Sequence, residues 1–206
     1  AGHRPEQRGS HDETYDGRND ERYDERYVAT SPAPGSLALV AAGRALPIVY
    51  SREDHPGVVR VVHDLQADVE RVTSVRPELS PDAVPAGARE IVLVGTLGAS
   101  PLVDRLVAEG TLDVEGVEGR WETSLEQVVE NPLPGVDRAF VIAGSDQRGT
   151  IYGVYETSRQ MGVSPWYWWN DVPPRRHRAL YVLPGRHSQG TPAVKYRGFF
   201  INDENP

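Results

Sequence analysis

Apolar residues along this chain gather in short runs and helical stripes that begin near residue 37. The segment 37–50, LALVAAGRALPIVY, holds two apolar runs around Ala42-Gly43-Arg44, a pattern typical of a β-hairpin. In the segment 51–74 the apolar spacing is helical, with Asp54 placed to cap the helix and Pro56 at a tolerated early position. The apolar face of this predicted helix consists of Val58, Val61, Val62, Leu65, Val69 and Val72.

The rest of the chain alternates predicted strands and helices. Apolar runs at 90–95 (EIVLVG) and 139–145 (AFVIAGS) are typical of buried strands, and 121–130 reads as a further strand. A second helix covers 101–110 and ends at a glycine. A third covers 146–162, with one side formed by Ile151, Val154, Tyr155 and Ser158. The order β-β-α-β-α-β-β-α predicts an α/β fold, a small open sheet covered by helices.

Hydrophobic residues are distributed unevenly along the chain. Hydrophobic residues make up 38% of the whole, yet residues 1–36 contain no Leu, Ile, Phe or Met. Such a segment cannot bury enough apolar surface to offset its chain entropy, so it is predicted to be a disordered polar arm. The predicted organisation continues with an N-terminal α/β domain at 37–185, a linker at 186–193 and the start of a new unit at 194–206.

Net charge and residue types exclude several classes of function. The formal charge of −8 argues against a nucleic-acid surface and leaves no basic face for anionic membranes. No stretch approaches the ~20 apolar residues of a membrane helix. The absence of cysteine excludes disulfides, thiolate metal sites and a cysteine nucleophile. No pair among the six histidines has metal-ligand spacing, so neither a metal nor another cofactor is expected.

Two loops between a strand and a helix have the topology of anion-binding sites. GTLGAS at 95–100 is built of small residues but lacks the GxGxxG spacing and the Walker lysine. In GSDQRGTIYG at 144–153, Asp146 can cap the helix, and Arg148 can pair with it or with a neighbouring loop. In both loops the structural interpretation is favoured over phosphate binding or catalysis.

The segment GVSPWYWWND at 162–171 concentrates three tryptophans, Trp166, Trp168 and Trp169, within four residues. Aromatic side chains packed this densely in a loop indicate sugar stacking or a protein interface. The competing interpretation is a packed domain boundary with Trp168 and Trp169 buried. The two interpretations are compatible if that boundary also borders a pocket.

The segment FFINDE at 199–204 is the strongest candidate for chemistry. In a regular strand Asp203 points to one side, and Asn202 and Glu204 point to the other. Cooperating carboxylates must face each other across a substrate, ~5 to 9 Å apart in sugar hydrolysis. Two adjacent residues of one strand do not meet this condition. At most one of the two carboxylates is therefore half of a catalytic pair.

Three segments resemble one known family. The segments GTLGASPLVDRL, WETSLEQVVENPLPGVDRAFVIAGSDQRGTIYGVYETSRQMGVSPWYWWNDVP and KYRGFFINDENP are similar to the N-terminal region of glycoside hydrolase family 115, the xylan α-1,2-glucuronidases. The resemblance runs from residue 37 to residue 206. It implies a hexosaminidase-like N-terminal α/β domain before a (β/α)8 barrel, with 194–206 as the first barrel strand. Asp203 and Glu204 would lie at the carboxyl end of that strand, where barrel active sites are found.

The resemblance also implies an activity and a set of roles. The full enzyme would remove (4-O-methyl-)glucuronic acid from xylan with inversion, using two carboxylates. Asp203 would act as the water-activating base or as a sugar-hydroxyl acceptor, with Glu204 as the second catalytic candidate. Asn202 would bind substrate, and Trp166, Trp168 and Trp169 would border the same pocket. The general acid and the uronate-binding residues would come from later strands, so the 206 residues alone are expected to be inactive.

Other expectations concern partners and location. The expected partner is glucuronoxylan or its oligosaccharides, with no nucleic acid and no membrane, and a homodimeric full-length enzyme is a hypothesis. The start at Ala1 without Met suggests a processed or cropped precursor, and secretion is the favoured hypothesis for an otherwise open location. The alternative function is a non-catalytic carbohydrate-binding or docking module with the tryptophan cluster as its platform. Nucleotide binding at 95–100 is a third hypothesis.

Overall fold

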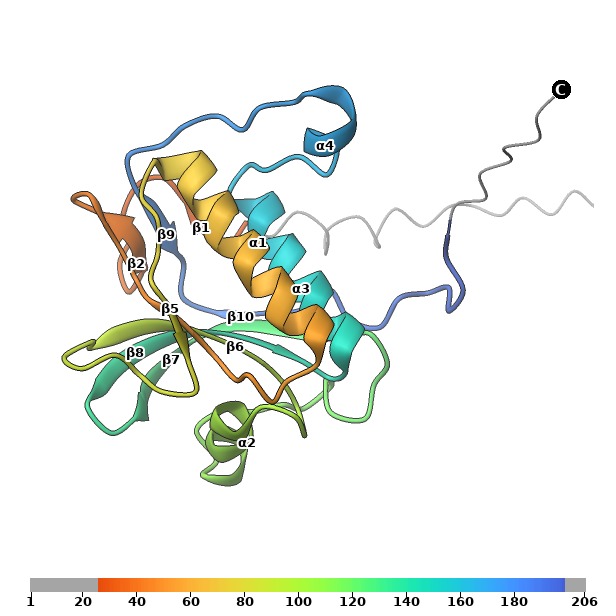
Figure 1. The fold of residues 1–206 in the computed structure, drawn as a ribbon. Helices are drawn as coiled ribbons and strands as arrows, with labels where there is room; N and C mark the ends of the chain where they lie inside the picture. The colour runs from red at the N-terminus through yellow and green to blue at the C-terminus, as the bar shows by residue number, and fades with distance from the viewer. Residues whose placement is uncertain (1–25, 199–206) are drawn as a thin grey trace, which may run out of the picture.

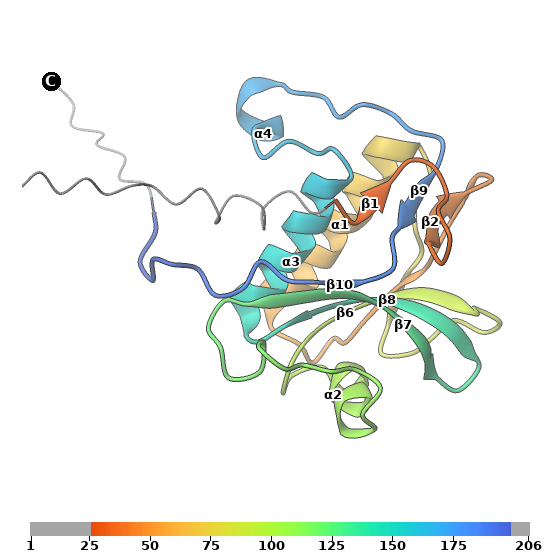
Figure 2. The same cartoon turned by 180° about the vertical axis from the view of Figure 1, so that it is seen from behind.

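A computed structural model of the chain describes residues 26–198. Its centre is a six-stranded sheet with helices on both faces, and a four-stranded sheet lies beside the helices of one face (Figures 1 and 2). The fold is mixed α/β, which confirms the predicted class and adds a second sheet. Across residues 26–198, no helix has the length and apolar character needed to cross a membrane.

The larger sheet has the strand order β10-β7-β8-β6-β4-β5. Strands β5, β4, β6 and β8 are parallel to one another. Of these, β4, β6 and β8 are inner strands with buried side chains, which is why the sequence shows them as continuous apolar runs. Beyond β8, the inner strand β7 and the edge strand β10 are antiparallel to their neighbours. The strands are β4 (Ile48–Tyr50), β5 (Leu79–Pro81), β6 (Glu90–Thr96), β7 (Ser124–Leu133), β8 (Val136–Gly144) and β10 (Arg186–His187).

Three helices cover this sheet. Helices α1 (Pro56–Thr73) and α3 (Gln147–Gln160) lie side by side on one face, and α2 (Pro101–Ala108) covers the other (Figure 1). All six apolar positions predicted for the first helix are buried in the core under α1. Proline opens α1, as predicted, because the first helical residues have no intrahelical partner for an N–H.

The buried face of α3 differs from the predicted stripe. Val154 and Ser158 are buried, but Tyr155 is 48% exposed. The helix packs on the sheet through small residues instead. A Cβ atom added at Gly149 would lie 2.3 Å from the carbonyl oxygen of Thr123, so the helix sits too close for a larger side chain. A face built of glycine, threonine and serine leaves no apolar signal in the sequence, and for this reason the predicted stripe was wrong at Tyr155, although Val154 and Ser158 are buried and Ile151 packs against the core.

The smaller sheet has the order β1-β9-β2-β3 and packs beside α1 and α3. The turn predicted at Ala42-Gly43 is confirmed, but it joins β2 only to the two-residue β3. The second apolar run, β4, leaves the hairpin and pairs in parallel within the larger sheet. The strands are β1 (Val28–Ala29), β2 (Leu37–Ala41), β3 (Arg44–Ala45) and β9 (Leu180–Val182).

The predicted bounds of the disordered arm, 1–36, and of the linker, 186–193, both include residues that belong to the folded domain. Tyr27 is 2% exposed, and its hydroxyl lies 3.0 Å from Thr157 Oγ1 on α3. The following strand, β1, pairs with β9, so residues 27–36 are part of the fold. The linker contains β10, which extends the larger sheet along β7. In both places the partner is distant in the chain, and local composition does not show it. Residues 1–25 lie outside the described part.

Asp54 does not cap α1 as predicted. Its Oδ1 accepts from the backbone N–H of His55 at 2.7 Å, and its Oδ2 accepts from the backbone N–H of Thr96 at 2.7 Å. The side chain is 4% exposed. Asp54 therefore connects the start of α1 to the carboxyl end of β6.

Replacing Asp54 by alanine is expected to lower the free energy of unfolding by about 2 kcal/mol, because two backbone N–H groups lose their acceptor. Urea unfolding followed by circular dichroism measures this effect. The control is Glu53→Ala at an exposed neighbouring position, for which a change within about 0.5 kcal/mol is expected. Equal losses in the two variants would contradict this role of Asp54.

Candidate functional site

The tryptophan segment forms an exposed turn of helix, α4 (Tyr167–Asn170). Trp166, Trp168 and Trp169 are 56%, 73% and 79% exposed, so the interpretation with Trp168 and Trp169 buried was wrong. The Arg71 guanidinium lies 4.9 Å from the Tyr167 ring centroid and 5.0 Å from that of Trp168. This cation–π contact holds the short helix against the end of α1 and leaves most of the Trp168 side chain exposed.

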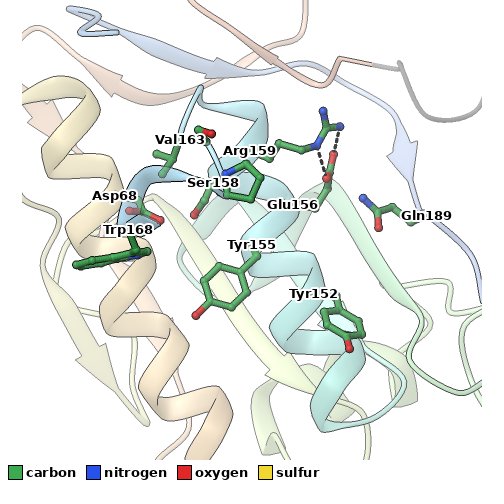
Figure 3. A pocket seen from close by; sticks show the side chains of 11 residues that line it. Asp68, Tyr152, Tyr155, Glu156, Ser158, Arg159, Val163, Trp168 and Gln189 are labelled. Carbon is green, nitrogen blue, oxygen red and sulfur yellow. Dashed lines mark hydrogen bonds and ion pairs between the residues drawn. The ribbon is translucent and has the colours of Figure 1, made fainter. Parts of the chain in front are cut away.

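An open hollow of about 470 Å³ lies over α3, between α1 and the segment before α4 (Figure 3). Its volume is within the ~300–1,000 Å³ of small-molecule sites. Trp168 lines it, whereas Trp166 and Trp169 do not. Tyr152 and Tyr155 project from α3, and Gln189 lies on the side of Glu156, opposite Trp168 (Figure 3). The remaining lining residues are Asp68, Glu156, Ser158, Arg159, Val163, Ser164 and Pro165.

Two carboxylates form the polar part of this hollow. Asp68 lies 2.5 Å from Arg71 Nη1, and Arg159 donates two hydrogen bonds to Glu156, at 2.6 and 2.7 Å. Each side chain is 8% exposed. Burial raises the pKa of Asp68, while Ser158 and Arg71 act in the opposite direction. Both carboxylates are thus held in place by an arginine at the edge of a cavity.

A second carboxylate cluster lies where the chain leaves the described part. Glu122 is 8% exposed and accepts from Arg148, at 2.9 Å, and from Arg197. Desolvation favours a higher pKa for Glu122, but the two arginines outweigh it and lower the pKa. Arg197 also stacks over the rings of Trp121 and Tyr152. This cluster fixes the course of residues 194–198 along the α3 side of the domain.

The sequence analysis missed one buried carboxyl group, Glu126 on β7. It is 1% exposed. Burial raises its pKa to about 8. A hydrogen bond with Ser124 acts in the opposite direction, and the nearby charge of Glu156 adds to the effect of burial. A Cβ atom added at Gly153 would lie 2.6 Å from Glu126 Oε1, so α3 covers the carboxyl directly. The signal in the sequence was the spacing of Glu126 from Val128. Residues two apart in a strand lie on the same face, and Val128 packs against the core on the face of β7 toward α3.

The two glycine-containing loops have structural roles. In the loop at 95–100, the Gly98 N–H donates to Asp104 Oδ1 at 2.7 Å, so a carboxylate of the protein occupies that donor. In the other loop, Asp146 caps α3 by accepting from Gly149 N–H at 2.8 Å, as predicted. Arg148 pairs with Glu122 of a neighbouring loop. These contacts account for both motifs without a ligand.

The carboxylates proposed from the terminal motif are outside the described part. Asn202, Asp203 and Glu204 follow residue 198, so the structure does not test their roles. Within residues 26–198 no group of three or more His, Asp or Glu side chains is placed to hold a metal ion.

We compared the chain with family models, curated protein sequences and solved structures. No family model and no curated protein sequence matches it. Among solved structures, its α/β unit matches part of a carbohydrate-active enzyme, a glycoside hydrolase. That protein is described as a novel family GH115 4-O-methyl-α-glucuronidase, BtGH115A, with specificity for decorated arabinogalactans. The match has a TM-score of 0.66 and 32% identity over 82% of this chain.

This match confirms the resemblance to the N-terminal region of glycoside hydrolase family 115 that the motifs predicted. The chain spans 20% of the length of the BtGH115A chain. A second solved structure, CpGH84D, has a TM-score of 0.43 and 7% identity over 76% of this chain and 22% of that one. A match at this level carries no argument about function.

Proposed function

We propose that the chain is the N-terminal part of a glycoside hydrolase that removes (4-O-methyl-)glucuronic acid side chains from a polysaccharide. The observation that carries the proposal is the match to BtGH115A at 32% identity over 82% of this chain. The motif resemblance suggests xylan as the polysaccharide, while BtGH115A is specific for decorated arabinogalactans. Both polysaccharides therefore belong in the test.

The proposed catalytic residues lie at the end of the chain. Residues 194–206 would form the first strand of a (β/α)8 barrel, with Asp203 and Glu204 at its carboxyl end and Asn202 beside them. The exposed apolar side chains of Val194 and Tyr196, at 59% and 86%, are consistent with a segment that packs against further structure. In an inverting mechanism a carboxylate from this strand would activate water. A general acid from a later strand would protonate the leaving oxygen, with the two carboxyl groups ~6.5–9.5 Å apart.

The test compares the full-length protein with the 206-residue chain on two substrates, 4-O-methylglucuronoxylan and glucuronic-acid-decorated arabinogalactan. We expect the full-length protein to release uronic acid from at least one of them and the 206-residue chain to release none. Proton NMR of the first product should show the β-anomer if an α-linkage is inverted. The control substrate has its uronic acids reduced to neutral sugars. A full-length protein inactive on both substrates would refute the proposal.

A non-catalytic carbohydrate-binding module is the second candidate function. The high exposure of Trp166, Trp168 and Trp169 favours it, because indole faces open to solvent can stack on sugar rings. The same assay discriminates between the two, since a binding module would retain polysaccharide without releasing uronic acid from it.

A further inference from the structure

The hollow over α3 has a serine hydroxyl beside one of its carboxylates. Ser158 is 3% exposed and lines the hollow. Its hydroxyl hydrogen-bonds to Asp68, which favours the ionised carboxylate against the effect of burial. A carboxylate with one such neighbour can still accept further hydrogen bonds, because each of its oxygens has two lone pairs.

The neighbouring carboxylates are fixed acceptors. Asp68 is held by Arg71 and Glu156 by Arg159, and Gln160 also donates to Glu156 at 3.0 Å. Carboxylates held in this way need no reorganisation when they accept hydrogen bonds from ligand hydroxyl groups. Acceptors on both sides of a hydroxyl side chain suit a ligand that carries several hydroxyl groups.

Aromatic rings form the outer part of the same hollow. Trp168 lies beside Asp68, and Tyr155 and Tyr152 follow along α3 (Figure 3). Tyr155 is kept in place by a 3.1 Å hydrogen bond from its hydroxyl to Asp64 Oδ2, and Trp168 by the Arg71 guanidinium. Rings held by other side chains present apolar faces at low entropic cost, and the C–H faces of pyranoses pack against such rings.

The charges on the lining favour a neutral ligand. Among the residues that line the hollow, Asp68 and Glu156 are acidic, and the positive charge comes from Arg159, which is engaged with Glu156. An anionic sugar would meet two carboxylates and one arginine already in a bidentate ion pair. Repulsion between like charges therefore disfavours a uronate at this place.

We propose that this hollow binds a neutral pyranose segment of a polysaccharide. It would be a non-catalytic subsite on the α1–α3 face, separate from the carboxylates proposed to cleave the uronic acid. The proposal rests on the carbohydrate substrate class of the proposed function, but it does not depend on catalysis. Sugar hydroxyls would donate to Asp68 and Glu156, and Trp168 would stack on a ring.

The experiment is isothermal titration calorimetry of the 206-residue chain with xylohexaose and with a neutral β-galactohexaose. At least one of them is expected to bind. Trp168→Ala should lower the association constant at least about tenfold, because it removes a central aromatic contact.

The matched control is Trp169→Ala, which deletes the same side chain from the same short helix outside the hollow. It should change the association constant by less than about twofold, and thermal unfolding confirms that each variant is folded. Absence of binding to both oligosaccharides would overturn the proposal. Equal losses in Trp168→Ala and Trp169→Ala would do the same, because the site would then be a general tryptophan surface.

Two further titrations complete the test. A xylo-oligosaccharide carrying glucuronic acid should bind the 206-residue chain no more tightly than xylohexaose, and tighter binding would refute the charge argument. The full-length protein should also lose affinity on Trp168→Ala. If it does not, the hollow is covered by another part of the protein and the proposal fails. An inactive enzyme that still binds neutral sugar refutes only the proposed activity, and an active enzyme whose Trp168→Ala variant binds normally refutes only this subsite.

Discussion

Replacing Asp203 by asparagine in the full-length protein is expected to lower the rate of uronic acid release by about 10²- to 10⁴-fold. This range is typical of the loss of a general base. The amide is nearly isosteric with the carboxylate but cannot accept a proton from the attacking water. The measurement is kcat on the better of the two decorated polysaccharides, with released uronic acid determined by chromatography.

Glu204→Gln provides the matched control, because in the proposed strand the neighbouring side chain would point to the opposite face. A loss of less than about tenfold is expected for this variant. A larger loss for Glu204→Gln than for Asp203→Asn would show that the strand faces the substrate with its other side. Equal losses would contradict the alternation argument, because two adjacent residues of a regular strand cannot both enter one pocket.

Replacing Glu126 by glutamine is expected to stabilise the domain at neutral pH. The pKa of Glu126 is about 8 in the folded protein, against 4.5 for an ordinary glutamate. Between these values the folded state keeps a proton that the unfolded state has lost, so this group makes stability fall as pH rises. At pH 7 the penalty is about 3 kcal/mol, and above pH 8 it no longer grows. Below pH 4.5 both states are protonated and the penalty disappears.

Urea unfolding of the wild type and of Glu126→Gln between pH 4.5 and 8.5 measures this effect. The wild type should lose stability across the range relative to the variant, and the two should be similar near pH 4.5. The control is Glu130→Gln, at an exposed position of the same strand, which should follow the wild type. Parallel pH profiles for the wild type and Glu126→Gln would show that the carboxyl is not forced to protonate on folding.

Helix α1 and strand β6 show how much of the fold the sequence alone could predict. The six apolar positions of α1 recur at helical spacing, and all six are buried. The apolar run of β6 is buried on both faces, as expected for an inner parallel strand. In these elements the periodicity is local, so every residue needed for the inference lies within a few positions of the next.

The errors concern contacts between distant segments. Tyr27 belongs to a polar stretch in the sequence, yet it packs against Phe140, with ring centroids 6.1 Å apart. Asp54 has the place of a helix cap, yet its second oxygen accepts from Thr96 on a different element. Neither partner is visible in the neighbouring sequence, because β8 and β6 are brought to these residues only by the packing of the sheets and helices.

The candidate site divides in the same way. Sequence patterns identified the α/β class and the tryptophan cluster, because these depend on local spacing and composition. The terminal strand with its adjacent carboxylates stays a prediction, because it lies outside the described residues. Only the tertiary structure separated Trp168, which lines the hollow, from Trp166 and Trp169, which do not. It also joined Trp168 to Asp68 and Ser158 from two other helices and enclosed Glu126 beneath α3. The lining of the hollow and the burial of Glu126 both depend on segments that are distant in the chain and meet only in the folded protein. The order of neighbouring residues does not show such contacts.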